Sequence, residues 1–335
     1  MPPVAVEVWR GDRVESRHRA SAAVVDRAGR TLLAVGDTDQ PVYPRSAIKP
    51  IQAVPLVESG AAAAFGLDEA ELALACASHG GEPVHVRSVG AWLARLGLTE
   101  SALACGPHPP SHAPSAELLI AQGQRPTRLH NNCSGKHAAM LTLARHLGAS
   151  ALGYERPDHP VQRAVRTVLD ELTDGAVLDP PAIDGCGVPT WAVPLRALAL
   201  AFARLGSPDQ LPPARRDACR RIALAMVRQP LMVAGSGRLC TALLELGGGL
   251  LAKTGAEGVY VAAMPGSSLG LALKVEDGAS RAAEVALLAT LERLGWLPEP
   301  VVRDLARFAR PILRNHAGTE VGRILPAPGW LGDAP

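Results

Sequence analysis

Residues 45–50 read Arg-Ser-Ala-Ile-Lys-Pro and place a serine and a lysine three positions apart. Where such a segment opens a helix, side chains at positions i and i+3 share one face, so the Lys49 amine can reach the Ser46 hydroxyl. A serine nucleophile needs a neighbouring base, and a partly buried lysine can serve as one. The pattern alone is weak evidence, because any serine cap followed by a lysine in the first helical turn matches it.

A second lysine motif lies far along the chain. Residues 251–255, Leu-Ala-Lys-Thr-Gly, read as a lysine leaving a strand into a tight turn, the K-T-G pattern that accompanies S-x-x-K in penicillin-recognising serine enzymes. The S-D-N motif of that set is absent, and residues 77–81, Ala-Ser-His-Gly-Gly, offer a second serine instead. The Ser78 hydroxyl has an alternative role as a cap for the helix expected near Glu82.

Hydrophobic periodicity predicts an α/β protein around these motifs. Alternating apolar residues predict antiparallel strands over residues 4–35, and helical spacing follows over residues 46–248. The strand pattern returns over residues 250–275, and helices are predicted over residues 282–309. We therefore expect an antiparallel sheet domain of residues 1–45 plus 249–335, flanked by helices. Residues 46–248 form a mostly helical region, and the active site is expected in the cleft between the two.

Composition excludes several classes of protein. Hydrophobic residues make up 47% and charged residues 20% of the 335 residues, as in ordinary globular proteins. A net charge of +2 without runs of like charge, together with 3% aromatic residues, argues against nucleic-acid binding. No apolar run approaches the roughly 20 residues of a membrane span, and the N-terminus does not resemble a secretory signal. We expect a cytoplasmic protein with reduced cysteines and, without phosphate-binding motifs, no organic cofactor.

Two further segments gather titratable side chains. Residues 130–137, His-Asn-Asn-Cys-Ser-Gly-Lys-His, precede an amphipathic helix, whose N-terminus should lower the thiol pKa of Cys133, with Lys136 on the same face. Residues 184–189, Asp-Gly-Cys-Gly-Val-Pro, read as a tight turn that presents a carboxylate and a thiol. Two distant cysteines are weak evidence for zinc, and a lysine ligand would have to lose its proton.

Six motifs together resemble the rhizobial-type, or class 3, L-asparaginases. They are Arg45 to Pro50, Cys76 to Pro83, His130 to Ala138, Asp184 to Pro189, Ala234 to Arg238 and Ala252 to Gly258. The resemblance spans about residues 4–326 and implies a fold similar to that of serine β-lactamases and penicillin-binding proteins. It also implies a homodimer, with two Ser-Lys pairs and a zinc site that supports substrate binding. The residues implied are Ser46 with Lys49, Ser78 with Lys253, and Cys133, Lys136 and Cys186 around zinc, near Asp184.

The expected activity is hydrolysis of the L-asparagine side-chain amide, with a β-aspartyl ester on Ser46 as the intermediate. Free asparagine carries an α-ammonium and an α-carboxylate, so a specific site should offer an opposite charge to each. Asp184 suits the ammonium, and Arg45 or Arg238 suits the carboxylate, although an arginine can equally form a surface ion pair. Further hydrogen bonds to the substrate are expected from His137, Asn131 and Asn132.

Three other functions are compatible with the same residues. The chain could be a β-lactam or peptide amidase that uses the Ser-Lys apparatus on a bulkier substrate. It could also be a ligand sensor without catalysis, or a hydrolase in which zinc generates hydroxide. The preference between asparagine and glutamine is not determined by the sequence.

Overall fold

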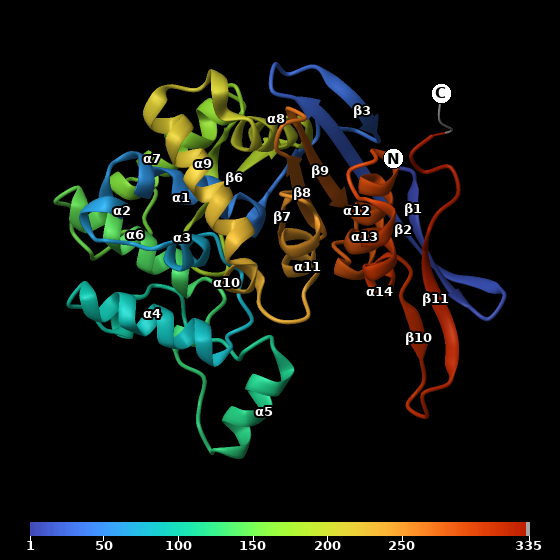
Figure 1. The fold of residues 1–335 in the computed structure, drawn as a ribbon, viewed down its shortest axis with the longest axis horizontal. Helices are drawn as coiled ribbons and strands as arrows, with labels where there is room; N and C mark the ends of the chain where they lie inside the picture. The colour runs from blue at the N-terminus through green and yellow to red at the C-terminus, as the bar shows by residue number, and fades with distance from the viewer. Residues whose placement is uncertain (333–335) are drawn as a thin grey trace. The chain divides into compact units, whose positions relative to one another are not determined.

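The computed structural model describes residues 1–332. Its chain forms two compact units, whose elements are labelled in Figure 1. The sheet unit comprises Met1–Ala47, Val193–Ser207 and Leu246–Pro335, and the helical unit comprises Ile48–Ala192 and Pro208–Glu245.

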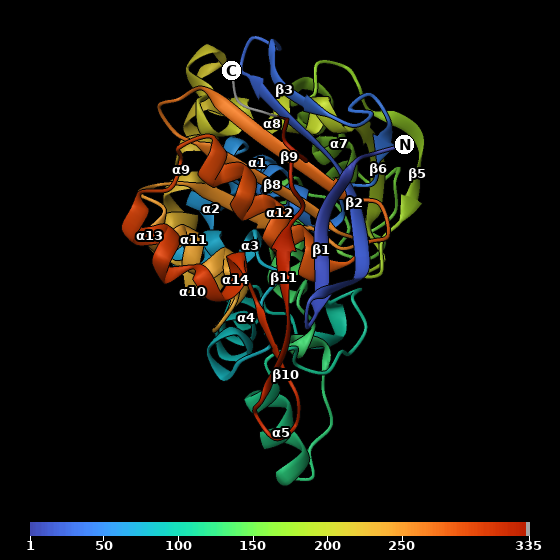
Figure 2. The same cartoon turned by 90° about the vertical axis from the view of Figure 1, so that its right-hand side faces the viewer.

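One antiparallel sheet is the framework of the sheet unit. Its strands follow the order β10-β11-β1-β2-β9-β8-β7, with β3 beside β2. Both ends of the chain contribute, since Val6 of β1 pairs with Pro326 of β11 and Ala22 of β2 pairs with Leu273 of β9 (Figure 2). The strands are β1 (Val4–Arg10), β2 (Arg13–Asp26), β3 (Thr31–Val35), β7 (Leu251–Thr254), β8 (Val259–Met264), β9 (Leu269–Val275), β10 (Ile312–Arg314) and β11 (Glu320–Pro326). The predicted α/β class, with an antiparallel sheet made from the N- and C-terminal segments, is confirmed.

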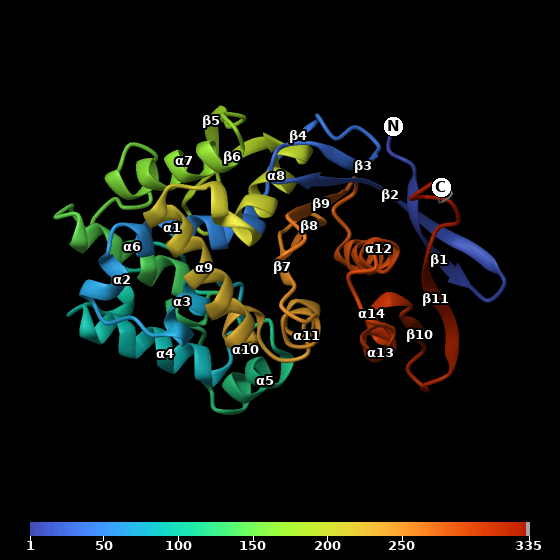
Figure 3. The ribbon, with the colours of Figure 1, turned by 45° about the horizontal axis from the view of Figure 1, so that its top comes forward.

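Helices pack on the sheet from two sides. Helix α12 (Ser280–Arg293) contacts β1, β8, β9 and β11, and α8 (Leu195–Gly206) contacts β2, β8 and β9 (Figure 3). The approach of α8 is close because β9 has a glycine there: a Cβ on Gly270 would overlap backbone atoms of Ala199 and Ala203. Two short helices, α13 (Glu299–Asp304) and α14 (Ala306–Ala309), follow α12.

The division of the chain into units differs from the sequence interpretation at α8. This helix interrupts the helical region in sequence, yet it belongs to the sheet unit. Helix α8 is rich in alanine, and such small side chains allow close contact with a sheet. Their pattern in the sequence does not indicate which element the helix packs against. A short strand, β4 (Pro41–Val42), pairs with the end of β6 (Pro189–Pro194), directly before α8.

The helical unit is organised around α1 (Lys49–Glu58), in which nine of the ten residues are buried. This helix contacts α6, α7 and α9 (Figure 3). Strand β5 (Leu178–Ile183) pairs with β6, and neither strand had a counterpart among the predicted elements. The other helices are α2 (Ala61–Ala64), α3 (Glu69–Ala75), α4 (Pro83–Arg95), α5 (Ala113–Ala121), α6 (Ser134–His146), α7 (Pro160–Leu172), α9 (Pro213–Arg228), α10 (Pro230–Ala234) and α11 (Leu239–Leu246). Within residues 1–332, no helix is both long and apolar enough to cross a bilayer.

Candidate active site

Lys49 and Ser78 form a buried Ser-Lys pair in the helical unit. Lys49 is the first residue of α1 and is 1% exposed. Its Nζ donates to Ser78 Oγ at 3.0 Å and to the Ala77 carbonyl at 2.6 Å. The Ser78 backbone N–H is held in turn by the Val233 carbonyl at 2.9 Å. The sequence interpretation assigned Lys49 to Ser46, so this contact with Ser78 is new.

The other two catalytic candidates lie in the sheet unit. Ser46 is half-buried in a 3-10 turn, Arg45–Ile48, that leads into α1. Lys253 in β7 is 1% exposed, and its Nζ donates to the Thr254 carbonyl at 3.0 Å. Gly255 allows the turn after Lys253 to pack against the segment that carries Ser46. A Cβ at this position would lie 2.6 Å from the Pro44 carbonyl and 3.4 Å from the Ala47 Cβ.

The backbone beside Ser46 is in an unusual conformation. Arg45 has a φ of 52°, in the left-handed region that residues other than glycine rarely occupy. Holding such a residue there costs on the order of 1–3 kcal/mol, and strain of this kind is found preferentially at functional sites. The chain therefore accepts a less stable backbone conformation at Arg45, which is consistent with a functional role for the Ser46 turn.

The predicted zinc-ligand residues converge in the helical unit. Lys136, in the first turn of α6, donates to Cys186 Sγ at 2.9 Å and is 2% exposed. Cys133, the N-cap of α6, lies close enough to Cys186 for a hydrogen bond between their side chains. Residue spacing alone gave only weak evidence of this proximity, since Cys186 comes from the turn between β5 and β6, but the family resemblance implied it.

A glycine fixes the position of this cluster against α3. A Cβ on Gly135 would lie 2.6 Å from the Leu74 Cγ and closer still to the Leu74 carbonyl oxygen. The first turn of α6 therefore packs directly on the backbone at the end of α3. Because α3 leads into the Ser78 segment and α6 carries Lys136, this contact couples the Ser-Lys pair to the cysteine cluster.

The charges of the cluster are complementary. The pKa of Cys186 is lowered far below that of an ordinary thiol by its hydrogen bond with Cys133 and by the Lys136 cation, against the effect of burial. The same hydrogen bond, together with burial, raises the pKa of Cys133, so the lowering expected from its place at the N-terminus of α6 is wrong. Burial would lower the pKa of Lys136, but the neighbouring Cys186 and Cys133 raise it. Cys186 and Lys136 therefore each favour the charged form of the other.

The donor set is compatible with zinc. Two sulfur atoms and one amine nitrogen are ligand types that zinc accepts, provided that Lys136 gives up a proton. Within residues 1–332, no three side chains from the histidine, cysteine, aspartate and glutamate set converge as a metal site, so the lysine would be essential to this one.

The predicted substrate-binding residues around the cluster have different surroundings. Asp184 is half-buried and lies close enough to Lys136 to raise its pKa. Asn131 donates from Nδ2 to the Gly106 carbonyl at 2.8 Å and accepts from the Cys133 N–H at 2.9 Å, so its amide shapes the loop. Asn132 is half-buried, and its Oδ1 lies 3.0 Å from Cys133 Sγ.

Arg238 follows a segment that a neighbouring loop holds in place. It is half-buried and directly follows Ser236 and Gly237, and Ser236 donates from its N–H and its hydroxyl to the Glu82 carboxylate, each at 2.7 Å. Gly235 is required there: its φ is 92°, and a Cβ would lie 2.5 Å from Glu82 Oε1. The segment before Arg238 is thereby joined to the loop that follows Ser78.

Several residues of the site had not been identified from the sequence. His137 Nδ1 lies 2.6 Å from the hydroxyl of Tyr154, which also accepts the Ala104 N–H at 2.8 Å. Cys105 is buried, interacts electrostatically with Cys186 and Lys136, and has its pKa raised by burial to about 12. Neither Tyr154 nor the segment around Cys105 carries a motif that could have pointed to this role.

A pair of stacked histidines supports the Ser78 loop. The His79 and His85 rings lie 4.8 Å apart at an interplanar angle of 13°. Burial lowers the pKa of both, and in His79 the charges of His85 and Lys49 lower it further. His79 Nδ1 accepts from the Gly81 N–H, and its Nε2 lies 2.9 Å from Ser134 Oγ, so a neutral ring connects this loop to α6.

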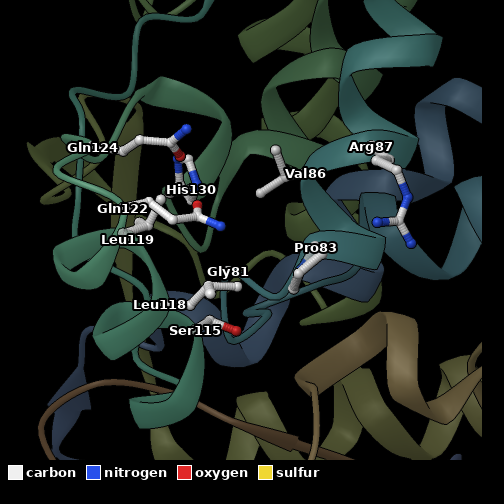
Figure 4. A pocket seen from close by; sticks show the side chains of 10 residues that line it. All are labelled: Gly81, Pro83, Val86, Arg87, Ser115, Leu118, Leu119, Gln122, Gln124 and His130. Atoms are coloured by element: carbon white, nitrogen blue, oxygen red, sulfur yellow. The ribbon is translucent and has the colours of Figure 1, made fainter.

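A surface pocket of about 280 Å³ lies between α4 and α5, and Gly81 of the loop after Ser78 is among its lining residues (Figure 4). It is lined by apolar side chains such as Val86, Leu118 and Leu119 and by the polar side chains of Gln122, Gln124, Arg87 and His130. The pocket shares Gly81 and His130 with the loops that carry Ser78 and Cys133, but none of the catalytic or zinc candidates lines it.

Comparisons with solved structures found distant similarities. Mglu in its native form is 17% identical, with 83% of this chain and 64% of Mglu covered and a TM-score of 0.49. A β-lactamase from Sphaerobacter thermophilus is 17% identical, with 87% and 91% covered and a TM-score of 0.40. A β-lactamase from Mycobacterium bovis is 15% identical, with 87% and 95% covered and a TM-score of 0.35.

These similarities carry no argument about activity, and the alignment with Mglu spans less than two thirds of the length of that protein. No curated protein matched the chain. A family profile described as L-asparaginase II matches residues 6–326, which is nearly the whole chain and contains every motif of the candidate site. The chain therefore belongs to the L-asparaginase II family.

Proposed function

We propose that this protein hydrolyses the side-chain amide of L-asparagine to L-aspartate and ammonia. The observation that carries the proposal is the buried contact of Lys49 Nζ with Ser78 Oγ at 3.0 Å, since such a pair can move a proton to or from a serine hydroxyl. Membership of the L-asparaginase II family supports the same class of reaction.

Ser46 is the proposed nucleophile. Its hydroxyl oxygen forms a bond to the amide carbon, and the hydroxyl proton passes to a lysine amine, for which Lys49 is the proposed acceptor. The C–N bond then breaks, and the departing nitrogen takes up a proton and leaves as ammonia. Water next adds to the β-aspartyl ester, and cleavage of the bond to Ser46 releases aspartate and restores the hydroxyl.

Ser78 and Lys253 are proposed to relay protons between these steps. The Lys49 contact gives Ser78 a path to the same amine, and the strained Arg45 backbone supports a special role for Ser46. The backbone N–H of Ser46 is a candidate donor to the developing oxyanion.

Recognition of free asparagine requires groups for both of its α-substituents. Asp184 is proposed to bind the ammonium, and Arg45 or Arg238 the carboxylate. His137 and Asn132 are proposed to contribute hydrogen bonds, and Asn131 to hold their loop in shape.

A zinc ion and a second subunit are also part of the proposal. Cys133 Sγ, Lys136 Nζ and Cys186 Sγ would hold the ion, whose positive charge would help to orient an anionic substrate group. We further propose that the protein is a cytoplasmic homodimer. Gel filtration with light scattering tests the dimer directly, and a monomeric mass would refute it.

The decisive experiment measures ammonia release from L-asparagine and L-glutamine by the wild type, Ser46→Ala and Ser78→Ala. Loss of the nucleophile should lower kcat by about 10³-fold or more. In a quenched reaction, mass spectrometry should find the aspartyl ester on Ser46. An ester on Ser78 would exchange the roles of the two serines.

Two other results would point to different functions. A stable adduct of Ser46 with penicillin, without turnover of asparagine, would favour a β-lactam or peptide amidase. Saturable asparagine binding without ammonia release would favour a sensor. As a control for the loss of a buried hydroxyl, Thr290→Val alters a residue in α12 outside the candidate site and should retain activity.

A further inference from the structure

Glu82 is a buried carboxylate that contacts two segments of the helical unit. It directly precedes α4 and accepts hydrogen bonds from the Ser236 N–H and hydroxyl, each at 2.7 Å. Burial opposes ionisation, but the two hydrogen bonds from Ser236 hold the pKa of Glu82 below its usual value. Hydrogen bonds to an ionised carboxylate are stronger than those between neutral groups. Glu82 is therefore a strong attachment point for Ser236.

The segment that contains Ser236 has little conformational preference of its own. Gly235 and Gly237 flank the serine with φ values of 92° and 72°, which glycine adopts without steric cost. Such a segment keeps one conformation only if contacts with other segments compensate for the lost conformational entropy. The Thr241 hydroxyl donates to the Gly235 carbonyl at 2.6 Å, and the Glu82 carboxylate holds the serine itself.

The Glu82 carboxylate also lies against the loop that follows Ser78. A Cβ on Gly80 would lie 3.3 Å from Glu82 Oε1. A Cβ on Gly235 would lie 2.5 Å from the same oxygen and 3.0 Å from the Gly80 nitrogen. Because neither glycine has a side chain, the two segments can meet at this carboxylate.

Other hydrogen bonds hold the beginning of the second segment but not its end. The Ser78 N–H donates to the Val233 carbonyl, and His85 Nε2 donates to the Leu231 carbonyl, each at 2.9 Å. Both carbonyls belong to α10, which ends before the first of the two glycines. Loss of the Glu82 carboxylate should therefore leave α10 attached and release the residues that follow it.

Arg238 is the functional candidate in the released residues. It lies two positions after Ser236, so their Cα atoms are within about 8 Å of each other. Arg238 is half-buried, and within residues 1–332 its guanidinium makes no ion pair or hydrogen bond. A guanidinium without a carboxylate partner is suited to bind the carboxylate of a ligand.

We propose that Glu82 is a positioning residue whose carboxylate holds residues 235–238 against the Ser78 loop and so fixes Arg238 relative to the Ser-Lys pair. The consequence for asparagine binding rests on the proposed function, whereas the attachment of the segment does not.

Hydrogen exchange measures the attachment without substrate or metal. Mass spectrometry of the full chain, digested after exchange, follows the amide protons of residues 235–238. Glu82→Ala should raise their exchange rates about tenfold or more, because the Ser236 amide loses a bond to a charged acceptor. Glu82→Gln keeps an acceptor oxygen and should retain most of the protection. Unchanged exchange in Glu82→Ala would overturn the proposal.

Glu71→Gln is the matched control. Glu71 is also a buried glutamate of the helical unit, in the first turn of α3, and its carboxylate accepts a hydrogen bond from Arg95. This variant should leave the exchange of residues 235–238 unchanged. If Glu82→Ala does not fold, Ser236→Ala removes one of the two bonds from the other side and should give a smaller rise. Wild-type exchange in Ser236→Ala would then overturn the proposal.

Kinetic measurements separate positioning from direct contact with the substrate. In an active enzyme, Glu82→Ala should raise KM for asparagine about tenfold with a smaller change in kcat, and Glu82→Gln should recover most of the loss. In an Arg238→Ala background, Glu82→Ala should have little further effect on KM, because the group that it positions is already absent. A full additional effect would overturn a role that acts through Arg238.

The two proposals can fail separately. Absence of ammonia release from wild-type protein would count against the asparaginase activity, while the exchange rates still decide whether Glu82 holds residues 235–238. Raised exchange with an unchanged KM in an active enzyme would overturn the positioning role of Glu82 and leave the asparaginase activity established.

Discussion

Replacing Gly135 by alanine tests whether close packing of α6 on α3 holds the site together. Alanine is favoured over glycine by about 1 kcal/mol in a helix interior, and this is the most that Gly135, in the first turn of α6, could gain. At Gly135 the new methyl group would lie 2.6 Å from the Leu74 Cγ and nearer to the Leu74 carbonyl oxygen. The backbone at the end of a packed helix cannot move far to make room for the methyl group. We therefore expect a destabilisation near the upper end of the range for overpacked cores, about 3 kcal/mol. The net change is a loss of about 2 kcal/mol in the free energy of unfolding.

Gly90 in α4 provides a control with the opposite sign. A Cβ there would meet no neighbour closer than Leu129 Cδ1, at 3.9 Å, so Gly90→Ala should gain the helix-propensity term of about 1 kcal/mol. Urea titration followed by circular dichroism gives both changes from the shift in midpoint at constant m-value. Ammonia release should fall in Gly135→Ala, because the Lys136 turn is displaced, and should be retained in Gly90→Ala.

A Gly135→Ala variant that is as stable as the wild type, or that is stabilised to the same extent as Gly90→Ala, would refute the close packing of α6 on α3. A loss of stability with full activity would refute only the coupling between packing and the catalytic groups.

Three further predictions concern charge and metal. Because the buried neutral His79 and His85 have pKa values below the 6.5 of an unfolded histidine, the unfolded state binds more protons as the pH falls below 6.5. The free energy of unfolding should therefore fall between pH 7 and pH 5, and a flat profile in urea titrations would contradict this. The Lys136→Met variant should lose bound zinc in metal analysis. The control variant Cys219→Ser, which alters a buried thiol in α9, should retain it. Equal zinc contents in the two variants would exclude Lys136 as a ligand. The Asp184→Ala variant should raise KM for asparagine about tenfold or more with a smaller change in kcat, and an unchanged KM would remove Asp184 from substrate recognition.

The strands were readable from the sequence because their signals are local. Val4, Val6 and Val8 alternate along β1, and turn residues separate β2 from β3, so two-residue periodicity located these elements. The antiparallel pairing of the two chain ends followed from the return of the same pattern after residue 249. Periodicity did not identify β4, β5, β6, β10 or β11, because these strands are short or irregular in pattern and depend on partners that are distant in sequence.

The candidate residues were also identifiable, but their pairing was not. Motif spacing singled out Ser46, Lys49, Ser78 and Lys253 as chemically unusual. The structure pairs Lys49 with Ser78, and it packs the turn after Lys253 against the segment that carries Ser46. Hydrogen bonds between residues 29 positions apart depend on how α1 and the loop after α3 pack, which is a property of the folded chain.

The sequence by itself determined the class of fold, the family motifs and the list of groups that can do chemistry, because each of these depends on residue type and short-range spacing. The tertiary structure alone determined the pKa values of these groups. The pKa of Cys186 is lowered because Cys133 and Lys136 meet it in a buried cluster, and the two cysteines raise the pKa of Lys136 in turn. Hydrogen bonding and desolvation act over a few ångströms in space, irrespective of distance along the chain.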